Sequence, residues 1–125
     1  MSNNWKRGFE IAKAASEYAT APRRSRQVGA ALFSGGALVA IGFNKYNHSH
    51  PAAQWGIHAE HAALIKRQYY PGRNLVMYVY RELNDGKPAC SKPCGNCQHL
   101  MHEAGVRFVR FVNSDGQFEQ INVER

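Results

Sequence analysis

The chain has 125 residues, of which 44% are hydrophobic and 20% charged, and these values are typical of one soluble globular domain. We therefore expect a single domain over residues 1–125. No apolar run approaches the roughly 20 residues that span a bilayer, and no signal peptide is visible, so a cytoplasmic protein without a membrane partner is expected. The net charge of +7 favours anionic partners such as nucleotide phosphates or a nucleic-acid strand.

The hydrophobic pattern predicts alternating helices and strands. Apolar residues at helical spacing predict helices over 5–21, which ends before Pro22, over 58–70, and over 95–104. β-prone runs predict strands over 28–33, 37–43, 75–80, 106–112 and 117–123. The uninterrupted apolar run at 75–80 suits a central strand that is covered on both faces. Residues 81–92 are interpreted as a polar connection.

Two connections indicate how the strands pair. Gly35 and Gly36 allow the positive φ of a tight turn, which predicts a hairpin between the first two strands. Only five residues separate Val112 from Phe118, whereas a parallel crossover needs a dozen or more, so the last two strands should form an antiparallel hairpin. The alternation elsewhere predicts a three-layer α/β/α fold with a five-stranded mixed sheet. The second and third helices start at strand C-terminal ends, where open α/β sheets bind ligands.

Three potential zinc ligands stand in two separated motifs, His-x-Glu and Pro-Cys-x-x-Cys. They are His58, Cys94 and Cys97, and a set of three leaves the fourth zinc position open for water, as in catalytic sites. Glu60 adds a carboxylate that need not bind the metal and can move the protons of that water. Cys90 lies outside the Pro-Cys-x-x-Cys motif, and we predict that it does not bind the metal. A purely structural zinc cluster is the alternative, against which Glu60 and the lack of an obvious fourth ligand argue.

The two motifs resemble the cytidine deaminase superfamily, because His-x-Glu followed by Pro-Cys-x-x-Cys is the signature of zinc-dependent nucleobase deaminases. The resemblance covers nearly the whole chain, from Val28 to Val106. It implies that His58, Cys94 and Cys97 hold one zinc ion per chain. It further implies a fold of the cytidine deaminase kind and a homo-oligomer, either a tetramer or a dimer.

The implied reaction is hydrolytic deamination of a cytosine compound to the uracil compound, with release of ammonia. Zinc lowers the pKa of its bound water from about 15.7 to around 7. By the resemblance, Glu60 takes a proton from that water and delivers it to ring N3. Attack then occurs at C4, and Glu60 protonates the leaving ammonia.

Candidate substrate contacts surround these motifs. The resemblance implies that Ala59 lies beneath the base and that Asn44 hydrogen-bonds a sugar hydroxyl. The basic loop that contains Arg26, together with Lys45, is a candidate for phosphate contacts, with a solvated turn as the alternative. Tyr80 stands near a strand end and could stack on the base, with a core position as the alternative.

The substrate signals point in two directions. Nucleoside-specific relatives usually carry a glutamate where Tyr46 stands, which leaves room for phosphate contacts, whereas the predicted terminal hairpin resembles the nucleoside branch. Our first hypothesis is deamination of a free cytosine nucleotide or nucleoside of the dCMP or deoxycytidine kind, with a deoxycytidylate-like compound as the first choice. The alternatives are cytosine deamination in single-stranded DNA or RNA, and a zinc-stabilised nucleotide-binding module without turnover. Guanine, adenosine and pterin deamination also occur in the superfamily.

Overall fold

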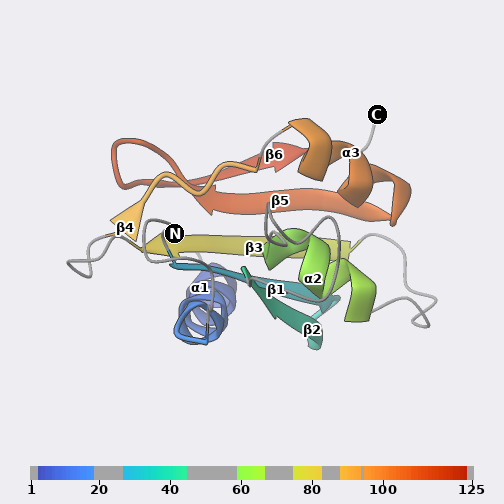
Figure 1. Cartoon of the computed structure of the whole chain (residues 1–125), viewed down its shortest axis with the longest axis horizontal. Helices are drawn as coiled ribbons and strands as arrows, with labels where there is room; N and C mark the ends of the chain where they lie inside the picture. The colour runs from blue at the N-terminus through green and yellow to red at the C-terminus, as the bar shows by residue number, and fades with distance from the viewer. Residues whose placement is uncertain are drawn as a thin grey trace, which may run out of the picture.

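A central β-sheet separates two helical layers, as Figure 1 shows. The computed structural model describes residues 3–18, 27–44, 59–66, 75–82, 88–93 and 95–123. Helix α1 (Asn3–Ser16) lies on one face, and helices α2 (Ala59–Lys66) and α3 (Gly95–Glu103) lie on the other. This arrangement confirms the predicted three-layer α/β/α fold.

The sheet has the strand order β2-β1-β3-β5-β6. Its main strands are β1 (Gln27–Ser34), β2 (Ala37–Phe43), β3 (Leu75–Glu82), β5 (Val106–Val112) and β6 (Phe118–Asn122). Strands β3 and β5 pair in parallel, and the β1–β2, β1–β3 and β5–β6 pairs are antiparallel. The mixed sheet and the C-terminal antiparallel hairpin are therefore confirmed.

The core has two parts, one under each helical layer. The larger part joins α2 and α3 to the sheet and includes Ala59, Met77, Val79 and Cys97. The smaller part lies between α1 and the sheet and includes Phe9. Within the ranges given above, no helix is long and apolar enough to cross a membrane.

The first helix differs from the prediction at both ends. Helix α1 starts at Asn3 and ends at Ser16, whereas a helix from 5 to 21 was predicted. The amide of Tyr18 donates to the carbonyl of Ala15, so the last turn tightens to a three-residue repeat. The Ser16 hydroxyl also donates to the Lys13 carbonyl, a local side-chain bond that competes with continuation of the helix. Residues 19–21 of the prediction lie outside the described residues.

The predicted polar connection over 81–92 was wrong in part. Arg81 and Glu82 continue β3, and a two-residue strand β4 (Pro88–Ala89) pairs with them. Strand pairing uses backbone groups, so polar side chains at a solvent-exposed strand end do not prevent it. Other boundaries moved less: the last strand is one residue shorter at each end than predicted, and residues 67–70 of the second predicted helix lie outside the described ranges.

Helix α1 lies directly on β1 because Gly29 has no side chain. A Cβ atom at Gly29 would lie 1.9 Å from the Ala12 carbonyl oxygen and 2.5 Å from the Ser16 nitrogen. We expect Gly29→Ala to lower the free energy of unfolding by about 1–3 kcal/mol, measured by urea denaturation. Gly36→Ala is the matched control, since a Cβ atom there meets nothing within 4 Å, and a change within about 0.5 kcal/mol is expected. Equal destabilisation by both substitutions would contradict this account.

Candidate active site

The candidate site lies at the edge of the sheet where β2 and β3 both end. Both strands are antiparallel to β1, and their residues Phe43 and Tyr80 pair with the same residue, Gly29. Helix α2 follows β2 in the chain, and α3 follows the two-residue strand β4, which pairs with the last two residues of β3 at this edge. The helices that carry Glu60 and Cys97 therefore both begin after strand segments at this edge, as predicted.

Glu60 lies in the first turn of α2 and is buried, with 6% of its surface exposed. Its neighbour Ala59, the first residue of the helix, is fully buried. The helix approaches β2 closely at Gly42, where a Cβ atom would lie 2.2 Å from the Ala59 carbonyl oxygen and 2.5 Å from the Ala63 nitrogen. A carboxylate near a helix N-terminus interacts favourably with the helix dipole. The close contact at Gly42 therefore fixes the position of a buried acid at the start of α2.

Cys97 lies in the first turn of α3 and is almost completely buried. It belongs to the same core cluster as Ala59, so the beginnings of α2 and α3 pack on a shared core. The Gln98 side-chain nitrogen donates to the Pro93 carbonyl at 2.9 Å and ties the start of α3 to the residue before Cys94. The N–H groups of a helix N-terminus favour a thiolate over a thiol. Cys97 therefore has the setting of a metal-binding cysteine.

A buried serine that the sequence analysis did not identify fixes the segment that leads into α3. The Ser91 hydroxyl donates to the Val79 carbonyl and accepts from the Val112 amide, both at 2.8 Å, and the Ser91 amide donates to the Val112 carbonyl. Ser91 thereby connects β3 to β5 two residues before Pro93. The sequence around Ser91 gives no local signal for such a role, because its partners are strands distant in the chain.

Asn44 directly follows β2 and closes the end of the first hairpin. Its side-chain oxygen accepts a hydrogen bond from the Val28 backbone amide at 2.9 Å, and the Asn44 backbone amide donates to the Val28 carbonyl at 3.2 Å. The sugar contact predicted for Asn44 stays a prediction, and it would be made by a side chain whose oxygen already accepts one hydrogen bond.

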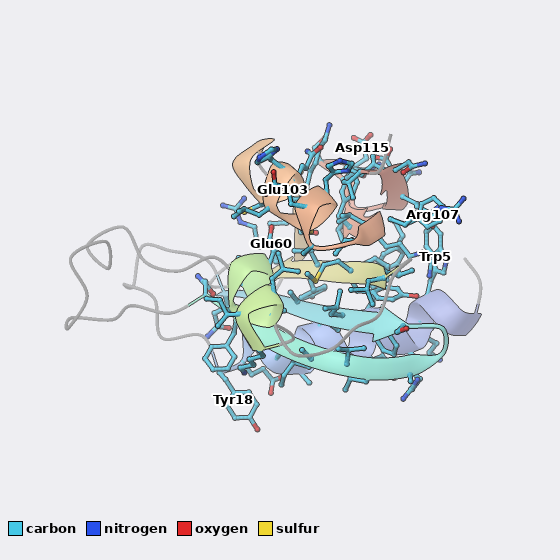
Figure 2. The ribbon with its side chains drawn as sticks, turned by 90° about the vertical axis from the view of Figure 1, so that its right-hand side faces the viewer. Trp5, Tyr18, Glu60, Glu103, Arg107 and Asp115 are labelled. Atoms are coloured by element: carbon cyan, nitrogen blue, oxygen red, sulfur yellow. The ribbon has the colours of Figure 1, made fainter. Side chains whose placement is uncertain are left out.

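Tyr80 is not brought together with Glu60. It pairs with Gly29 at the correct edge of the sheet, but its buried ring belongs to the core cluster under α1. Trp5 packs against the same cluster as Tyr80 and so marks the α1 side of the sheet. Figure 2 shows Glu60 on the other side, at α2. The core alternative for Tyr80 fits this position, and we do not retain it as a substrate contact.

The buried position of Tyr80 has a consequence at alkaline pH. Burial raises the pKa of the Tyr80 phenol above its ordinary value of 10.0, and the Glu82 carboxylate adds to this increase. The folded chain therefore holds this proton more tightly than the unfolded chain, and stability is lost as pH rises above about 10. Tyr80→Phe should show a smaller fall in Tm across this range than the wild type.

Tyr18→Phe provides the control, because it makes the same chemical change at a ring that is 66% exposed. Its Tm should follow the wild-type pH dependence. A Tyr80→Phe profile that runs parallel to the wild type would contradict the expected role of this phenol.

The candidate site residues that lie within the described ranges are of the kinds that suit a zinc site. They include Cys97 as a buried sulfur donor and Glu60 as a buried carboxylate at a neighbouring helix start. His58 and Cys94 lie outside the described residues, and each precedes the first residue of one of these helices in the chain. With these two outside, the described part of the chain contains no group of three or more potential ligands. The other predicted contacts, Arg26 and Lys45, also lie outside it.

Comparison with known proteins assigns the family. The sequence model of one protein family, the cytidine and deoxycytidylate deaminase zinc-binding region, matches residues 2–113, and the chain belongs to this family. The match includes both motifs, and the family name implies zinc binding. A comparison with curated protein sequences finds no match. The family assignment supports a hydrolase that deaminates pyrimidines.

Solved structures have the same fold. Cytidine deaminase from Burkholderia pseudomallei is 29% identical, with a TM-score of 0.74, and the match covers 98% of this chain and 94% of that one. Cytidine deaminase from Mycobacterium leprae is 28% identical, with a TM-score of 0.67 and coverage of 95% and 94%. The dCMP deaminase from cyanophage S-TIM5 is 20% identical, with a TM-score of 0.64 and coverage of 86% and 81%, which indicates a shared fold.

Proposed function

We propose that the chain is a zinc-dependent hydrolytic deaminase that converts a free cytosine nucleoside or nucleotide to the uracil compound and ammonia. The observation that carries this proposal is the placement of Glu60 and Cys97. Both are buried, and both stand in the first turns of helices that pack on one core at one edge of the sheet. The arrangement provides a buried carboxylate and a buried candidate metal ligand on adjoining helix starts, the two kinds of group that metal-assisted hydrolysis requires.

Glu60 is proposed as the proton carrier. It removes a proton from the attacking water and delivers it to ring N3 of cytosine, and then carries the second proton, from the hydroxyl formed at C4, to the amino group, which leaves as ammonia. Its burial keeps bulk water away from the carboxylate, and the close packing of α2 on Gly42 restricts where it can point. Positioning of this kind is a large part of general acid–base catalysis.

His58, Cys94 and Cys97 are proposed to hold the zinc ion. When bound, zinc supplies the Lewis acidity that brings the pKa of a water molecule close to neutrality. The methyl side chain of Ala59 is small enough to leave room for a pyrimidine ring. Asn44 is proposed to orient the sugar through its side-chain amide, which the hydrogen bond from the Val28 amide holds in place.

A nucleoside is the first substrate to test. The two relatives with 28% and 29% identity over nearly the whole chain are named cytidine deaminases. The antiparallel β5–β6 hairpin is also the feature that resembles the nucleoside branch. A monophosphate of the dCMP kind is the second substrate, since the net charge of +7 favours anionic ligands.

Substrate profiling of the zinc-loaded protein tests this proposal. Cytosine, cytidine, deoxycytidine, CMP, dCMP and dCTP would be incubated separately, with ammonia release and loss of cytosine absorbance as two independent readouts. We expect turnover of a nucleoside or its monophosphate and none of free cytosine, which lacks the sugar for Asn44. Inactivity on every free cytosine compound, in protein with bound zinc, would overturn the proposal.

A further inference from the structure

On the α1 side of the sheet, helix α1 leaves much of β5 and β6 uncovered by any helix in the described part of the chain. Helix α1 packs mainly on β1, β2 and β3. It contacts β5 and β6 through two side-chain pairs, Trp5 with Arg110 and Phe9 with Phe118. Strand register places Arg110 opposite Gln120. Phe118 is 40% exposed, so this half of the face is accessible to solvent. We call it the aromatic–arginine face and define it by six residues: Trp5, Arg107, Phe108, Arg110, Phe118 and Gln120.

The arginines of this face contact neutral groups. The Arg110 guanidinium lies 4.7 Å from the Trp5 ring centroid, donates from Nε to Gln120 at 2.8 Å, and donates from a terminal nitrogen to the Tyr78 hydroxyl. The exposed Arg107 lies 5.0 Å from the Phe108 ring centroid. In the described part of the chain, no carboxylate is within ion-pair distance of either guanidinium. A guanidinium has five N–H donors, so Arg110 keeps donors that can bind an anion.

No carboxylate on β5 or β6 shares this face. Glu119 pairs with Phe111, whose side chain lies in the core cluster on the α2–α3 side, so Glu119 points to the other side of the sheet. Asp115 lies in the turn that joins the two strands. Two copies of the chain that met here with two-fold symmetry would bring these arginines together without an acid from β5 or β6 to pair them. The charge therefore favours an anionic partner over a second copy.

The aromatic rings indicate which anion. Trp5, Phe108 and Phe118 are all partly exposed or exposed and lie on the same side as the arginines. Flat rings interleaved with arginines suit a polymer that alternates phosphates with unstacked bases, because each base can stack on a ring while each phosphate meets a guanidinium. A duplex keeps its bases stacked inside and cannot use the rings in this way.

We propose that the aromatic–arginine face binds single-stranded nucleic acid. Figure 2 shows Trp5 and Arg107 on the side of the sheet away from Glu60. The strand held here therefore lies away from the catalytic carboxylate, and binding does not require a cytosine. The surface adds a polyanion-binding activity to the proposed deaminase and does not depend on its chemistry.

Fluorescence anisotropy with a labelled single strand of adenine and thymine tests the proposal. The sequence contains no cytosine, so the deaminase site cannot account for binding. The wild type should bind at low salt and weaken as salt rises. Arg107→Gln should reduce the slope of log affinity against log salt by about 0.7 if one phosphate contact is lost. Phe118→Ala should weaken binding by about fivefold or more, the effect of losing a stacked base.

Lys66→Gln is the matched control for Arg107→Gln. It removes one exposed positive charge from the last turn of α2, on the other face of the sheet. Its affinity and salt slope should stay close to those of the wild type. All three variants should deaminate a free nucleoside as the wild type does, so failure of this proposal is distinguishable from failure of the proposed function.

Four results would overturn the proposal. They are an absence of binding at low salt, equal losses in Arg107→Gln and Lys66→Gln, equal affinity for the matched duplex, and a change in oligomeric mass of Phe118→Ala by light scattering. The third would mean that charge alone attracts nucleic acid, and the fourth would assign the face to contacts between copies. Because Arg107 is exposed and lies outside the core, its variant keeps the test valid if Phe118→Ala fails to fold.

Discussion

Replacing Glu60 with glutamine should lower kcat for deamination by about 100- to 10,000-fold, the usual contribution of a general acid–base group. Glutamine has nearly the same shape as glutamate but cannot take up or return a proton at neutral pH. Because Glu60 is buried at the start of α2, an isosteric change should leave the packing of that helix intact. The measurements are steady-state kinetics on the best substrate, thermal unfolding and zinc content.

Glu103→Gln is the matched control, because it removes a carboxylate that is exposed on α3, where it contacts His99 at 3.2 Å. It should keep wild-type kcat. If Glu60→Gln retained wild-type kcat, Glu60 would not be the proton carrier. If it lost activity together with zinc or the cooperative unfolding transition, the loss would reflect structure and not proton transfer.

Replacing Cys97 with serine should remove zinc and activity together. A serine hydroxyl does not supply the thiolate that zinc binds, and Cys97 is buried in the first turn of α3. We expect about one zinc per chain in the wild type and little in the variant, measured by elemental mass spectrometry after gel filtration. Cys90→Ser is the control and should retain zinc, since Cys90 lies outside the motif and its carbonyl accepts from Arg81.

Removal of the metal should reproduce the effect of this substitution on stability. A ligand that binds only the folded state stabilises it by RT ln(1 + [L]/Kd), or about 4 kcal/mol at a thousandfold excess over Kd. A chelator should therefore lower the Tm of the wild type and of Cys90→Ser but not that of Cys97→Ser. A wild-type Tm that does not respond to a chelator, in protein shown to lose zinc, would contradict a role of the metal in stability.

Much of the fold could be predicted because it depends on short-range constraints. The five residues between Val112 and Phe118 are too few for a crossover, and β5 and β6 form the expected hairpin. Gly35 adopts a positive φ of 62° in the turn between β1 and β2. Helix α2 (Ala59–Lys66) lies within the helix predicted over 58–70, and α3 begins at Gly95 as predicted.

The face on which Tyr80 lies could not be predicted. Strand β3 is covered on both sides, so its residues do not alternate between apolar and polar, and the sequence carries no mark of which side each ring faces. Only the observed clusters separate the two sets, with Met77 and Val79 under α2 and α3, and Tyr78 and Tyr80 under α1. A strand end at the correct edge of the sheet is therefore not sufficient evidence for a substrate contact.

The bonds of Ser91 have a consequence for how this chain can tolerate changes in length. Ser91 is hydrogen-bonded to Val79 and Val112, which fixes its position on the sheet. The number of residues from Ser91 to Cys97 therefore determines where Cys97 lies. An insertion or deletion there would move Cys97 relative to Glu60, whatever residues it contained. Natural variants of this enzyme with altered substrate preference should therefore differ in length elsewhere and keep the spacing from this serine to the cysteine constant.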